Sequence, residues 1–442
     1  MVRKAEKLMD IVNIFQPEPL SANEIDFYEP TAIARDGMGC EYHEMLYEHL
    51  CNADKPMHFL VIGHSGCGKT TEMYMLAKNL TNECDNTPSV IINATKDLNL
   101  SDFTYIDIFM LIVERLAKYA DENKIKINER IIRAFEAALS TRITREHWEQ
   151  DLKASIETEA GISAEIPFIT KLAAKITSSI RLASGLRDEL RLELKPKMSE
   201  ITEAVNAFIS DINAQGNDIV IMIDGLEKCR HECVRTLFIE DGTTLAAVKT
   251  HMVISCPLSL YRSSDKAMLQ SNFPFAELMP MIKTHYPNQE PYPSGVNVIE
   301  NIIKRRVDAS FFTGDSLNMI VKMGGGNLRE TFHLLRGSAF LAHIKNKGKA
   351  ESQTIDEDCV IAFFDKYSTD VFLGVKNKYY PTLKKIYDGN VDLENDEAIN
   401  ELLYAGAVFE YNAERWKDLN PLIRYHIDKK PEVIDSNPGV LD

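Results

Sequence analysis

The fold is decided by the stretch His58-Phe59-Leu60-Val61-Ile62-Gly63-His64-Ser65-Gly66-Cys67-Gly68-Lys69-Thr70. Its first five residues form a short apolar run, which predicts a buried strand. Beyond it, apolar residues recur at helical spacing, at Met73, Met75, Leu76 and Leu80. The loop between them has the pattern G-x-x-x-x-G-K-[ST], in which glycines let backbone N–H groups approach phosphate oxygens and the following helix adds its positive end. The sequence therefore predicts a strand, a phosphate-binding loop and a helix.

This loop predicts binding of ATP with Mg²⁺. Lys69 is expected to neutralise the β- and γ-phosphates, and the hydroxyl of Thr70 is expected to bind Mg²⁺. The alternative is a glycine turn without a ligand, which the flanking strand and helix disfavour. The predicted nucleotide-binding residues are Gly63, His64, Ser65, Gly66, Cys67, Gly68, Lys69, Thr70 and Thr71.

A second, uniformly apolar run at 218–224 ends in Asp224 and predicts a strand without a solvent face. An acid at the tip of a strand beside the phosphate loop can hold Mg²⁺, so Asp224 is the predicted metal ligand with Thr70. The next residue is Gly225, and the nearest acid is Glu227. Glu227 is predicted to orient the attacking water; the alternative is a solvated acid at a helix start, in a site that binds ATP but turns it over slowly.

Further strands are predicted at 89–93 and 252–257, separated from the others by helical patterns, which favours an α/β fold with a parallel sheet. Residues 141–212 are charged and helical, and they are interpreted as an insertion between the two halves of the sheet. The predicted order is an N-terminal segment (1–56), the first half of an ATPase core (57–140), the helical insertion (141–212), the second half of the core (213–292), a helical lid (293–354) and a winged-helix-like domain (355–442).

Composition narrows the class of protein. The chain has 442 residues, of which 45% are hydrophobic and 26% charged, as in a globular protein of two or three domains. No apolar run approaches the roughly 18 residues of a membrane span, and no signal-peptide pattern follows Met1. The eight scattered cysteines suit a reducing compartment, so a cytoplasmic location without membrane attachment is expected. Cys229 and Cys233 lack a second ligand pair at zinc spacing, which disfavours a metal there.

Charge disfavours nucleic acid as a partner. The formal net charge is −16, which repels a DNA backbone at long range. The helix expected before the predicted hairpin at 407–418 would lie where a winged helix places its recognition helix, yet its charged residues are all acidic. These acids are Glu394, Asp396, Glu397 and Glu401. The basic stretch 171–197 is a better nucleic-acid candidate, but it also carries acids, and a solvated helical face is the preferred interpretation.

The order of these motifs resembles that of the AAA+ and STAND-type P-loop ATPases, in particular bacterial members of the origin-recognition and KAP-like branches. The resemblance rests on the loop 63–70 as Walker A, the Asp224 strand as Walker B, the strand carrying Ser255 as sensor 1, and the segment Gly324-Gly325-Gly326-Asn327-Leu328-Arg329 as a G-N-x-R sensor 2. It extends over about residues 15–430 and includes 278–283 and 418–424.

The resemblance implies roles for further residues. Ser255 would be sensor 1, although threonine or asparagine is commoner there, and Arg329 would reach the γ-phosphate from the lid. The alternative for Arg329 is a surface arginine behind a glycine turn. An arginine finger from a neighbouring subunit is expected in such ATPases; Arg262, Arg305 and Arg306 are candidates, and the sequence does not choose between them.

The expected function is an ATP-hydrolysing switch that couples nucleotide state to assembly. The catalytic residues would be Lys69, Asp224, Glu227, Ser255 and Arg329. The resemblance implies a homo-oligomer, a protein partner or effector, and a role in bacterial antiviral defence. Two rival functions stay open: an ATP-dependent DNA loader, and a nucleotide-gated scaffold that does not hydrolyse.

Overall fold

The computed structural model describes residues 4–20, 22–35, 39–84, 87–144, 168–347, 354–389, 397–411 and 416–435. Within these ranges the chain forms a parallel sheet of five strands in the order β2-β3-β4-β1-β5. The predicted α/β fold with a parallel P-loop NTPase sheet is confirmed. The strands are β1 (His58–Gly63), β2 (Ser89–Asn93), β3 (Val220–Asp224), β4 (His251–Pro257) and β5 (Phe275–Leu278).

Both faces of the central strands are buried, which explains their uninterrupted apolar sequences. Leu60 and Ile62 of β1 belong to a core on one face, and Phe59 and Val61 belong to a core on the other. The strand β3 alternates in the same way, and all five of its residues are buried. Because β4 lies between β1 and β3, the carboxyl ends of these three strands meet at one edge of the sheet.

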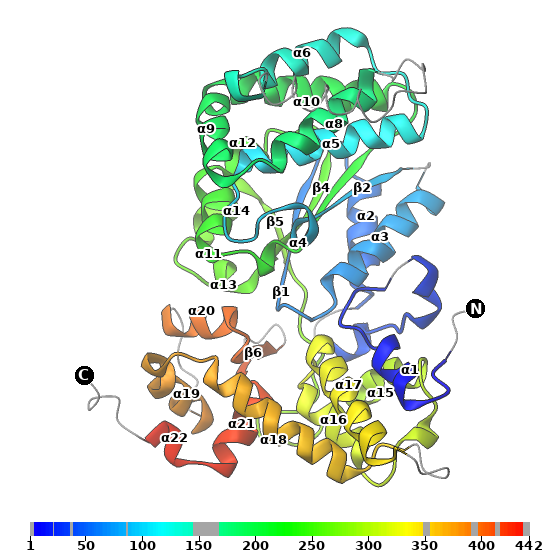
Figure 1. Cartoon of the computed structure of the whole chain (residues 1–442), viewed down its shortest axis with the longest axis vertical. Helices are drawn as coiled ribbons and strands as arrows, with labels where there is room; N and C mark the ends of the chain where they lie inside the picture. The colour runs from blue at the N-terminus through cyan, green and yellow to red at the C-terminus, as the bar shows by residue number, and fades with distance from the viewer. Residues whose placement is uncertain are drawn as a thin grey trace.

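A layer of helices covers one end of the sheet and forms the upper part of the molecule (Figure 1). Its members are α5 (Tyr105–Glu122), α6 (Glu129–Leu139), α8 (Phe168–Ile180), α9 (Ser184–Leu194), η3 (Lys195–Lys197) and α10 (Met198–Asn213). The helix α8 packs on α5, and α10 packs on both α5 and α6. The segment predicted as an insertion thus shares one continuous core with α5 and the sheet, and residues 145–167 of it lie outside the described part of the chain.

The opposite face of the sheet is covered by α2 (Tyr42–Cys51) and α3 (Lys69–Glu83), which pack on each other. Short helical segments join the strands. They are α4 (Ala94–Asp97), η4 (Leu226–Lys228), α11 (His231–Arg235), the π-helical η5 (Thr236–Glu240), α12 (Gly242–Leu245), α13 (Leu258–Tyr261) and α14 (Lys266–Asn272).

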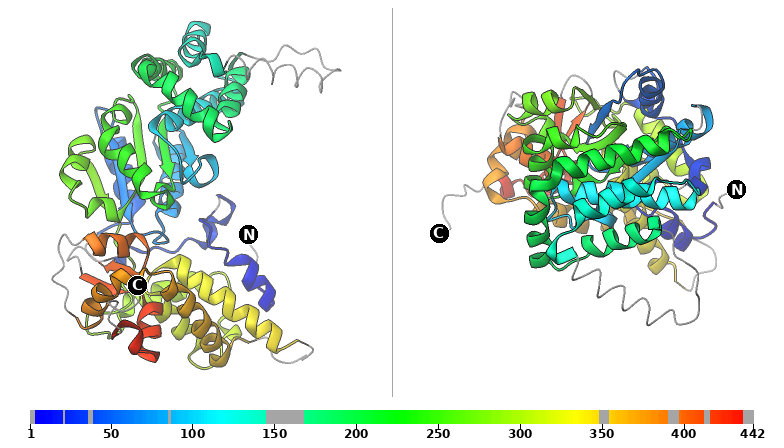
Figure 2. Two further views of the ribbon diagram at one scale, coloured as in Figure 1. Left: turned by 60° about the vertical axis from the view of Figure 1, so that its left-hand side comes forward. Right: turned by 90° about the horizontal axis from the view of Figure 1, so that it is seen from above.

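A lid of helices lies below the sheet in Figure 1 and beside the C-terminal unit, as the turned views of Figure 2 also show. It consists of α15 (Pro293–Lys304), η6 (Ala309–Phe311), α16 (Ser316–Gly324) and α17 (Leu328–Lys345). The side chain of Asn327 caps α17 by accepting hydrogen bonds from the amides of Arg329 and Glu330. The first helix of the chain, α1 (Leu8–Ile14), packs on α17, and the 3₁₀ turns η1 (Ala22–Phe27) and η2 (Ala32–Ala34) lead from it to α2.

The C-terminal unit contains the predicted hairpin. Strands β6 (Val408–Tyr411) and β7 (Trp416–Leu419) pair antiparallel; residues 412–415 of the predicted hairpin lie outside the described residues. The other elements are α18 (Glu357–Leu373), η7 (Asn377–Tyr379), α19 (Tyr380–Tyr387), α20 (Glu397–Tyr404), α21 (Pro421–Lys429) and α22 (Glu432–Asp435). The helix α18 packs on both α17 and α21, so it joins the lid to this unit. None of the helices described is long and apolar enough to cross a membrane.

Candidate nucleotide site

The phosphate loop lies at the carboxyl end of β1, directly before α3. The N-cap of α3 is Gly68, at a φ of 107°, and among the described residues no side chain caps this helix end. The first N–H groups of a helix have no partner within the helix. In α3 these groups stay available for an anion, which the positive end of the helix also favours.

The ammonium of Lys69 lies inside the loop and is 3% exposed. Its Nζ donates to the carbonyl oxygens of Gly63 at 3.0 Å and of His64 at 2.8 Å. It also lies 3.7 Å from Oε1 of Glu227. Lys69, the only cation of the loop, therefore lies between the loop backbone, which would hold a phosphate, and Glu227, the predicted catalytic acid.

Thr70 and Asp224 meet as a magnesium site requires. The Thr70 hydroxyl donates to Oδ2 of Asp224 at 2.8 Å. The other oxygen, Oδ1, is buried and has no hydrogen-bond partner among the described residues. Burial, and then the nearby charge of Glu227, raise the pKa of Asp224, so a cation between these oxygens would offset both effects. A hydroxyl and an unpartnered carboxylate oxygen are ligands that fit Mg²⁺.

Glu227 follows Asp224 closely because Gly225, at a φ of 89°, turns the chain sharply into η4. Its side chain lines the same cavity as Lys69 and Thr70, and its Oε2 is buried without a hydrogen-bond partner in the described structure. Burial raises the pKa of this carboxyl, but the charges of Lys69 and Lys228, together with hydrogen bonds, outweigh burial, so the pKa is lowered overall. Glu227 is thus an ionised acceptor facing the phosphate loop.

Ser255 lies on the neighbouring strand β4 and is fully buried. Its Oγ accepts a hydrogen bond from the amide of Leu226 at 3.0 Å. Leu226 begins η4, the turn that carries Glu227. Ser255 does not line the cavity; the structure places it behind η4, where it positions the turn.

The lid touches the phosphate loop directly. The guanidinium of Arg329 donates to Oγ of Ser65 at 2.5 Å, and the side-chain Nδ2 of Asn327 donates to the carbonyl of Ser65 at 2.9 Å. The amide of Leu328 donates to the carbonyl of Gly66 at 3.0 Å. A Cβ on Gly66 would lie 2.2 Å from Oδ1 of Asn327, and the φ of Gly66 is 86°. Glycine is therefore required here by this close approach as well as by its backbone angle.

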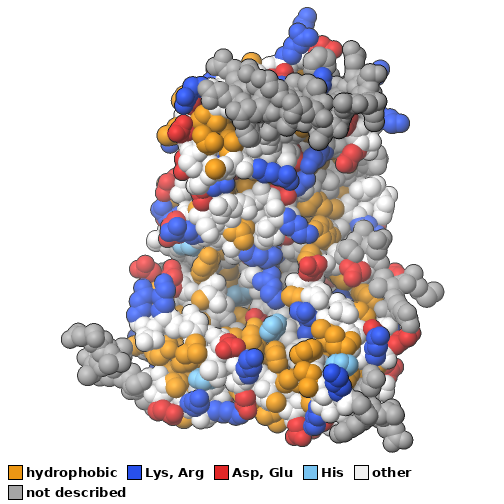
Figure 3. Space-filling view, in the orientation of Figure 1, with side chains coloured by type: hydrophobic (Ala, Val, Ile, Leu, Met, Phe, Trp, Pro, Cys, Tyr) orange, Lys and Arg blue, Asp and Glu red, His pale blue; other side chains and the backbone are white. Residues whose placement is uncertain are grey.

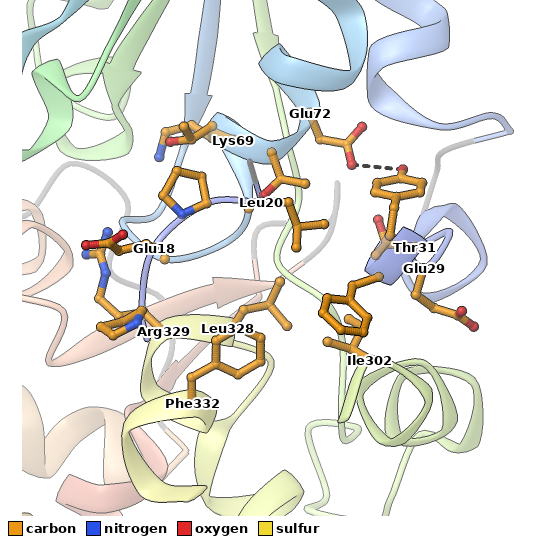
Figure 4. Close-up of a pocket in the computed structure, with 18 of the residues that line it drawn as sticks. Glu18, Leu20, Glu29, Thr31, Lys69, Glu72, Ile302, Leu328, Arg329 and Phe332 are labelled. Carbon is orange, nitrogen blue, oxygen red and sulfur yellow. Dashed lines mark hydrogen bonds between the residues drawn. The ribbon is translucent and has the colours of Figure 1, made fainter. Parts of the chain in front are cut away.

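The cavity continues from the loop into an apolar chamber (Figure 4). Leu328, Phe332 and Ile302 of the lid line one side, and Leu20 lies across from them. Pro17, Pro19 and Phe27 of the N-terminal segment complete the apolar lining. An apolar chamber beside a phosphate site suits the flat base of a nucleotide. No sequence motif points to this part of the site.

Two further buried residues were not predicted from the sequence. Arg35 is 2% exposed and donates to the carbonyl of Cys67 at 2.7 Å and to that of Pro280. Glu72, on α3, accepts from the hydroxyl of Tyr28 at 3.0 Å and from the amide of His43 at 3.1 Å. Both tie the N-terminal segment to the loop and its helix, and only the fold brings these residues together.

The back of the loop faces the C-terminal unit and the core. His64 is buried, and its Nε2 accepts a hydrogen bond from the amide of Glu410 in β6 at 2.8 Å. Burial, and then the charges of Lys69 and Arg262, lower the pKa of His64 to about 3. Cys67 is fully buried in the core beneath the loop. Of the nine predicted loop residues, Gly66, Gly68, Lys69, Thr70 and Thr71 line the cavity.

The three candidate arginine fingers all have partners within the chain. Arg262 binds Glu410 through Nε at 3.0 Å and Nη2 at 2.5 Å, and its side chain is 12% exposed. Arg306 is buried among aromatic rings and lines the nucleotide cavity. Arg305 pairs with Glu29 but keeps 42% of its side chain exposed. Arg305 is therefore the candidate with most access to a neighbouring molecule.

Comparison with known proteins agrees with this geometry. Residues 41–240 match the family described as the KAP family P-loop domain. No curated protein matches the sequence. The chain therefore contains a P-loop NTPase domain, and the phosphate loop and Asp224 lie within the matched residues.

Solved structures of similar arrangement have low identity. Cdc6p of Pyrobaculum aerophilum superposes with a TM-score of 0.40 at 14% identity, over 96% of each chain. The ORC1 protein of Aeropyrum pernix, solved in complex with DNA, gives a TM-score of 0.40 at 12% identity, over 97% of this chain and 98% of that one. The ORC2 protein of the same organism, solved as ADPNP–ADP complexes, gives 0.41 at 13% identity over 96% of each chain. At these scores the likeness carries no conclusion about activity or partners.

Proposed function

We propose that the P-loop NTPase domain hydrolyses ATP with Mg²⁺ and that the nucleotide controls how the lid and the C-terminal unit dock on the phosphate loop. One observation carries the proposal. The phosphate loop is hydrogen-bonded to the lid, through Ser65 and Arg329, and to the C-terminal hairpin, through His64 and Glu410. A change at the phosphates would therefore act on two modules at once.

The site has the groups that hydrolysis needs. Lys69 and the uncapped amides of α3 would hold the phosphates, and Thr70 with Asp224 would hold the metal. Mg²⁺ bound there would neutralise charge on the phosphate oxygens. Glu227 would orient a water through its unpartnered Oε2 and accept its proton, as the water oxygen bonds to the γ-phosphorus and the bond to the β–γ bridging oxygen breaks.

A slow rate fits the same geometry. The charge of Lys69 lowers the pKa of Glu227, and a carboxylate of lowered pKa is a weaker base at neutral pH. Slow hydrolysis favours an ATP-bound state that persists long enough to support a docked conformation. The lowered pKa of Glu227 also favours the rival function, a nucleotide-gated scaffold without turnover. Measured hydrolysis separates the two functions.

The docked lid and hairpin are proposed to present a surface for copies of the chain or for a protein partner. Nucleic acid is the less favoured partner, because the net charge is −16. The helix α20, which a winged helix would insert into DNA, instead packs on α13 and donates from Tyr404 to the carbonyl of Cys229 at 3.0 Å. Two acids predicted for its approach, Glu394 and Asp396, lie outside the described residues.

The test is steady-state release of phosphate from ATP. We expect measurable turnover in the wild type, and a loss of at least tenfold in Glu227→Gln with ATP affinity retained. Glu232→Gln is the matched control, because Glu232 lies on the same segment with 72% of its side chain exposed. Turnover equal to the wild type in Glu227→Gln would show that this acid does not act on the water. No turnover in the wild type, despite ATP binding, would favour the scaffold.

A further inference from the structure

A second polar hollow lies away from the phosphate loop, between α4 and α5 on one side and α8 and α9 on the other. Among the described residues, six cations line it: Lys96, Arg115, Lys118, Arg181, Arg187 and Arg191. Four acids line it as well: Asp97, Asp102, Asp107 and Glu114. The lining thus carries two more positive than negative charges, in a chain whose net charge is −16. Figure 3 shows Lys and Arg side chains down the middle of the molecule, and the upper part of this column lies at the height of α4 and α5 in Figure 1.

Some of the buried polar atoms around the hollow have no partner in the described structure. Arg187 is 8% exposed, and although its Nη2 binds Asp102, its Nε donates to nothing. Asp107 binds Arg191 through Oδ2, while Oδ1 accepts nothing. Oε2 of Glu114 and Nε of Arg115 form no hydrogen bond in the described structure, although they lie 3.6 Å apart as an ion pair. Native structures rarely leave several such atoms in one place without a ligand or ordered water.

Two cations of the lining are also unpaired. Within the described ranges, neither Lys96 nor Arg181 makes an ion pair, and both are exposed at the rim. Unpaired lysine and arginine beside buried guanidinium groups bind phosphate well, because the planar fork of arginine matches its oxygens. Oδ1 of Asp107 and Oε2 of Glu114 accept no hydrogen bond in the described structure, the latter lying 3.6 Å from Nε of Arg115, so each can accept from a hydroxyl group.

We propose that this hollow binds a small phosphorylated molecule that carries hydroxyl groups, such as a sugar phosphate or a nucleotide. The arginines hold the phosphate, and the two carboxylates accept from the hydroxyls. This site is separate from the phosphate loop and does not depend on hydrolysis there.

The hollow is connected to the ATPase site by packing contacts, through which a bound ligand could act on that site. The helix α4, which forms one wall, packs on η4, the turn that carries Glu227. Thr95 of α4 lies against Gly225, where a Cβ would meet its Cγ2 at 3.0 Å. The amide of Arg230 donates to the carbonyl of Leu100 at 2.8 Å. A ligand that binds Lys96 or Arg115 would therefore affect the position of η4, the turn that carries Glu227.

The test is calorimetric titration of the full chain in a Lys69→Ala background, so that the phosphate loop does not compete. The probes are ribose 5-phosphate, AMP, inorganic phosphate and ribose. We expect ribose 5-phosphate or AMP to bind at least tenfold more tightly than either phosphate or ribose alone. Binding by none of the phosphorylated probes would overturn the proposal, and phosphate alone binding as tightly would overturn the part assigned to Asp107 and Glu114.

Variants locate the binding. Arg181→Gln removes a cation that has no ion pair in the described structure, so the fold should stay intact, and affinity should fall at least fivefold. Arg187→Gln should lower affinity further, unless the loss of its bond to Asp102 unfolds the chain, which the melting temperature reveals. Arg130→Gln on α6, exposed and outside the hollow, is the matched control and should leave affinity unchanged. Unchanged affinity in Arg181→Gln would assign the binding elsewhere.

Discussion

The imidazole of His64, in the phosphate loop, accepts a hydrogen bond from the backbone amide of Glu410 in the C-terminal hairpin, at 2.8 Å. The two residues are 346 positions apart. The neighbouring Tyr411 donates its hydroxyl to the carbonyl of Gly325, in the turn before α17, at 2.7 Å. The hairpin therefore touches both the loop that would hold phosphate and the turn that leads to Arg329.

The first prediction concerns pH. Burial lowers the pKa of His64 to about 3 in the folded chain, against an ordinary value of about 6.5. Between these two values the unfolded chain binds a proton at His64 that the folded chain does not bind. The contribution of neutral His64 to stability is therefore complete above pH 6.5. As the pH falls below 6.5, the free energy of unfolding decreases by at most about 1.4 kcal/mol per pH unit. We expect thermal melts of the wild type to show this acid sensitivity.

His64→Gln isolates the effect. The glutamine oxygen can accept from the same amide but does not titrate in this range. The variant should lose less stability than the wild type between pH 7 and pH 5. Parallel pH profiles of the two proteins would assign the acid sensitivity to other groups.

The second prediction concerns the ion pair behind the loop. Arg262 binds both carboxylate oxygens of Glu410, which is 3% exposed. Removing one partner of a buried pair leaves a charge without support, and it typically costs about 3–5 kcal/mol. We expect Arg262→Ala to lose about 3 kcal/mol in chemical denaturation, the lower end, because Lys417 lies 3.7 Å from Glu410.

Arg235→Ala is the control for this loss. Arg235 also forms ion pairs, but its side chain is 41% exposed, and exposed pairs contribute about 0–1 kcal/mol. Equal effects of the two substitutions would mean that the Arg262–Glu410 pair does not hold the hairpin.

The third prediction is that Lys69→Ala abolishes detectable ATP binding while the fold is retained. Lys69 is the only cation of the loop, and its ammonium is already held by loop carbonyls in the position where phosphate would lie. Calorimetry measures binding, and circular dichroism checks the fold. ATP affinity close to that of the wild type would show that the phosphate loop does not bind the nucleotide.

The fourth prediction is that Asp224→Asn lowers turnover at least tenfold, a barrier increase of about 1.4 kcal/mol or more. The substitution keeps the shape that receives the Thr70 hydroxyl but removes the negative charge offered to Mg²⁺. Raising the Mg²⁺ concentration should partly restore the rate. Unchanged turnover at limiting Mg²⁺ would place the metal ligand elsewhere.

The sequence was most informative where chemistry dictates local pattern. The loop 63–70 and the strand ending in Asp224 each combine residue type with spacing, and the structure has the expected loop before α3 and the expected strand β3. The hairpin was predicted at 407–418, where β6 and β7 pair. These features depend on neighbours within a few residues.

Features that depend on distant contacts were not predicted. The strand β5 has four residues, none of them buried, and its sequence Phe-Ala-Glu-Leu does not alternate between apolar and polar residues. Arg35 and Leu20 reach the site only because α1 packs on α17 and thereby turns the N-terminal segment over the cavity. The bond from Glu410 to His64 uses a backbone amide, for which no side-chain pattern exists.

The central claim is that nucleotide state governs docking of the lid and hairpin on the phosphate loop. A charge-assisted contact from Arg329 to a γ-phosphate would contribute about 1.5–3 kcal/mol, which shifts a balanced two-state population roughly 10- to 150-fold. Because a ligand shifts an equilibrium only by its differential affinity for the two states, ATP should favour docking more than ADP does.

The measurement is hydrogen–deuterium exchange of the peptide that contains the Glu410 amide, with ADP and with a slowly hydrolysed ATP analogue. We predict exchange at least tenfold slower with the analogue in the wild type. In Arg329→Ala the difference should disappear, with ATP affinity retained within roughly tenfold because Lys69 and the loop amides provide most of the binding. Equal exchange in the two nucleotides in the wild type would contradict the account, since the hairpin would then be docked regardless of what the loop holds.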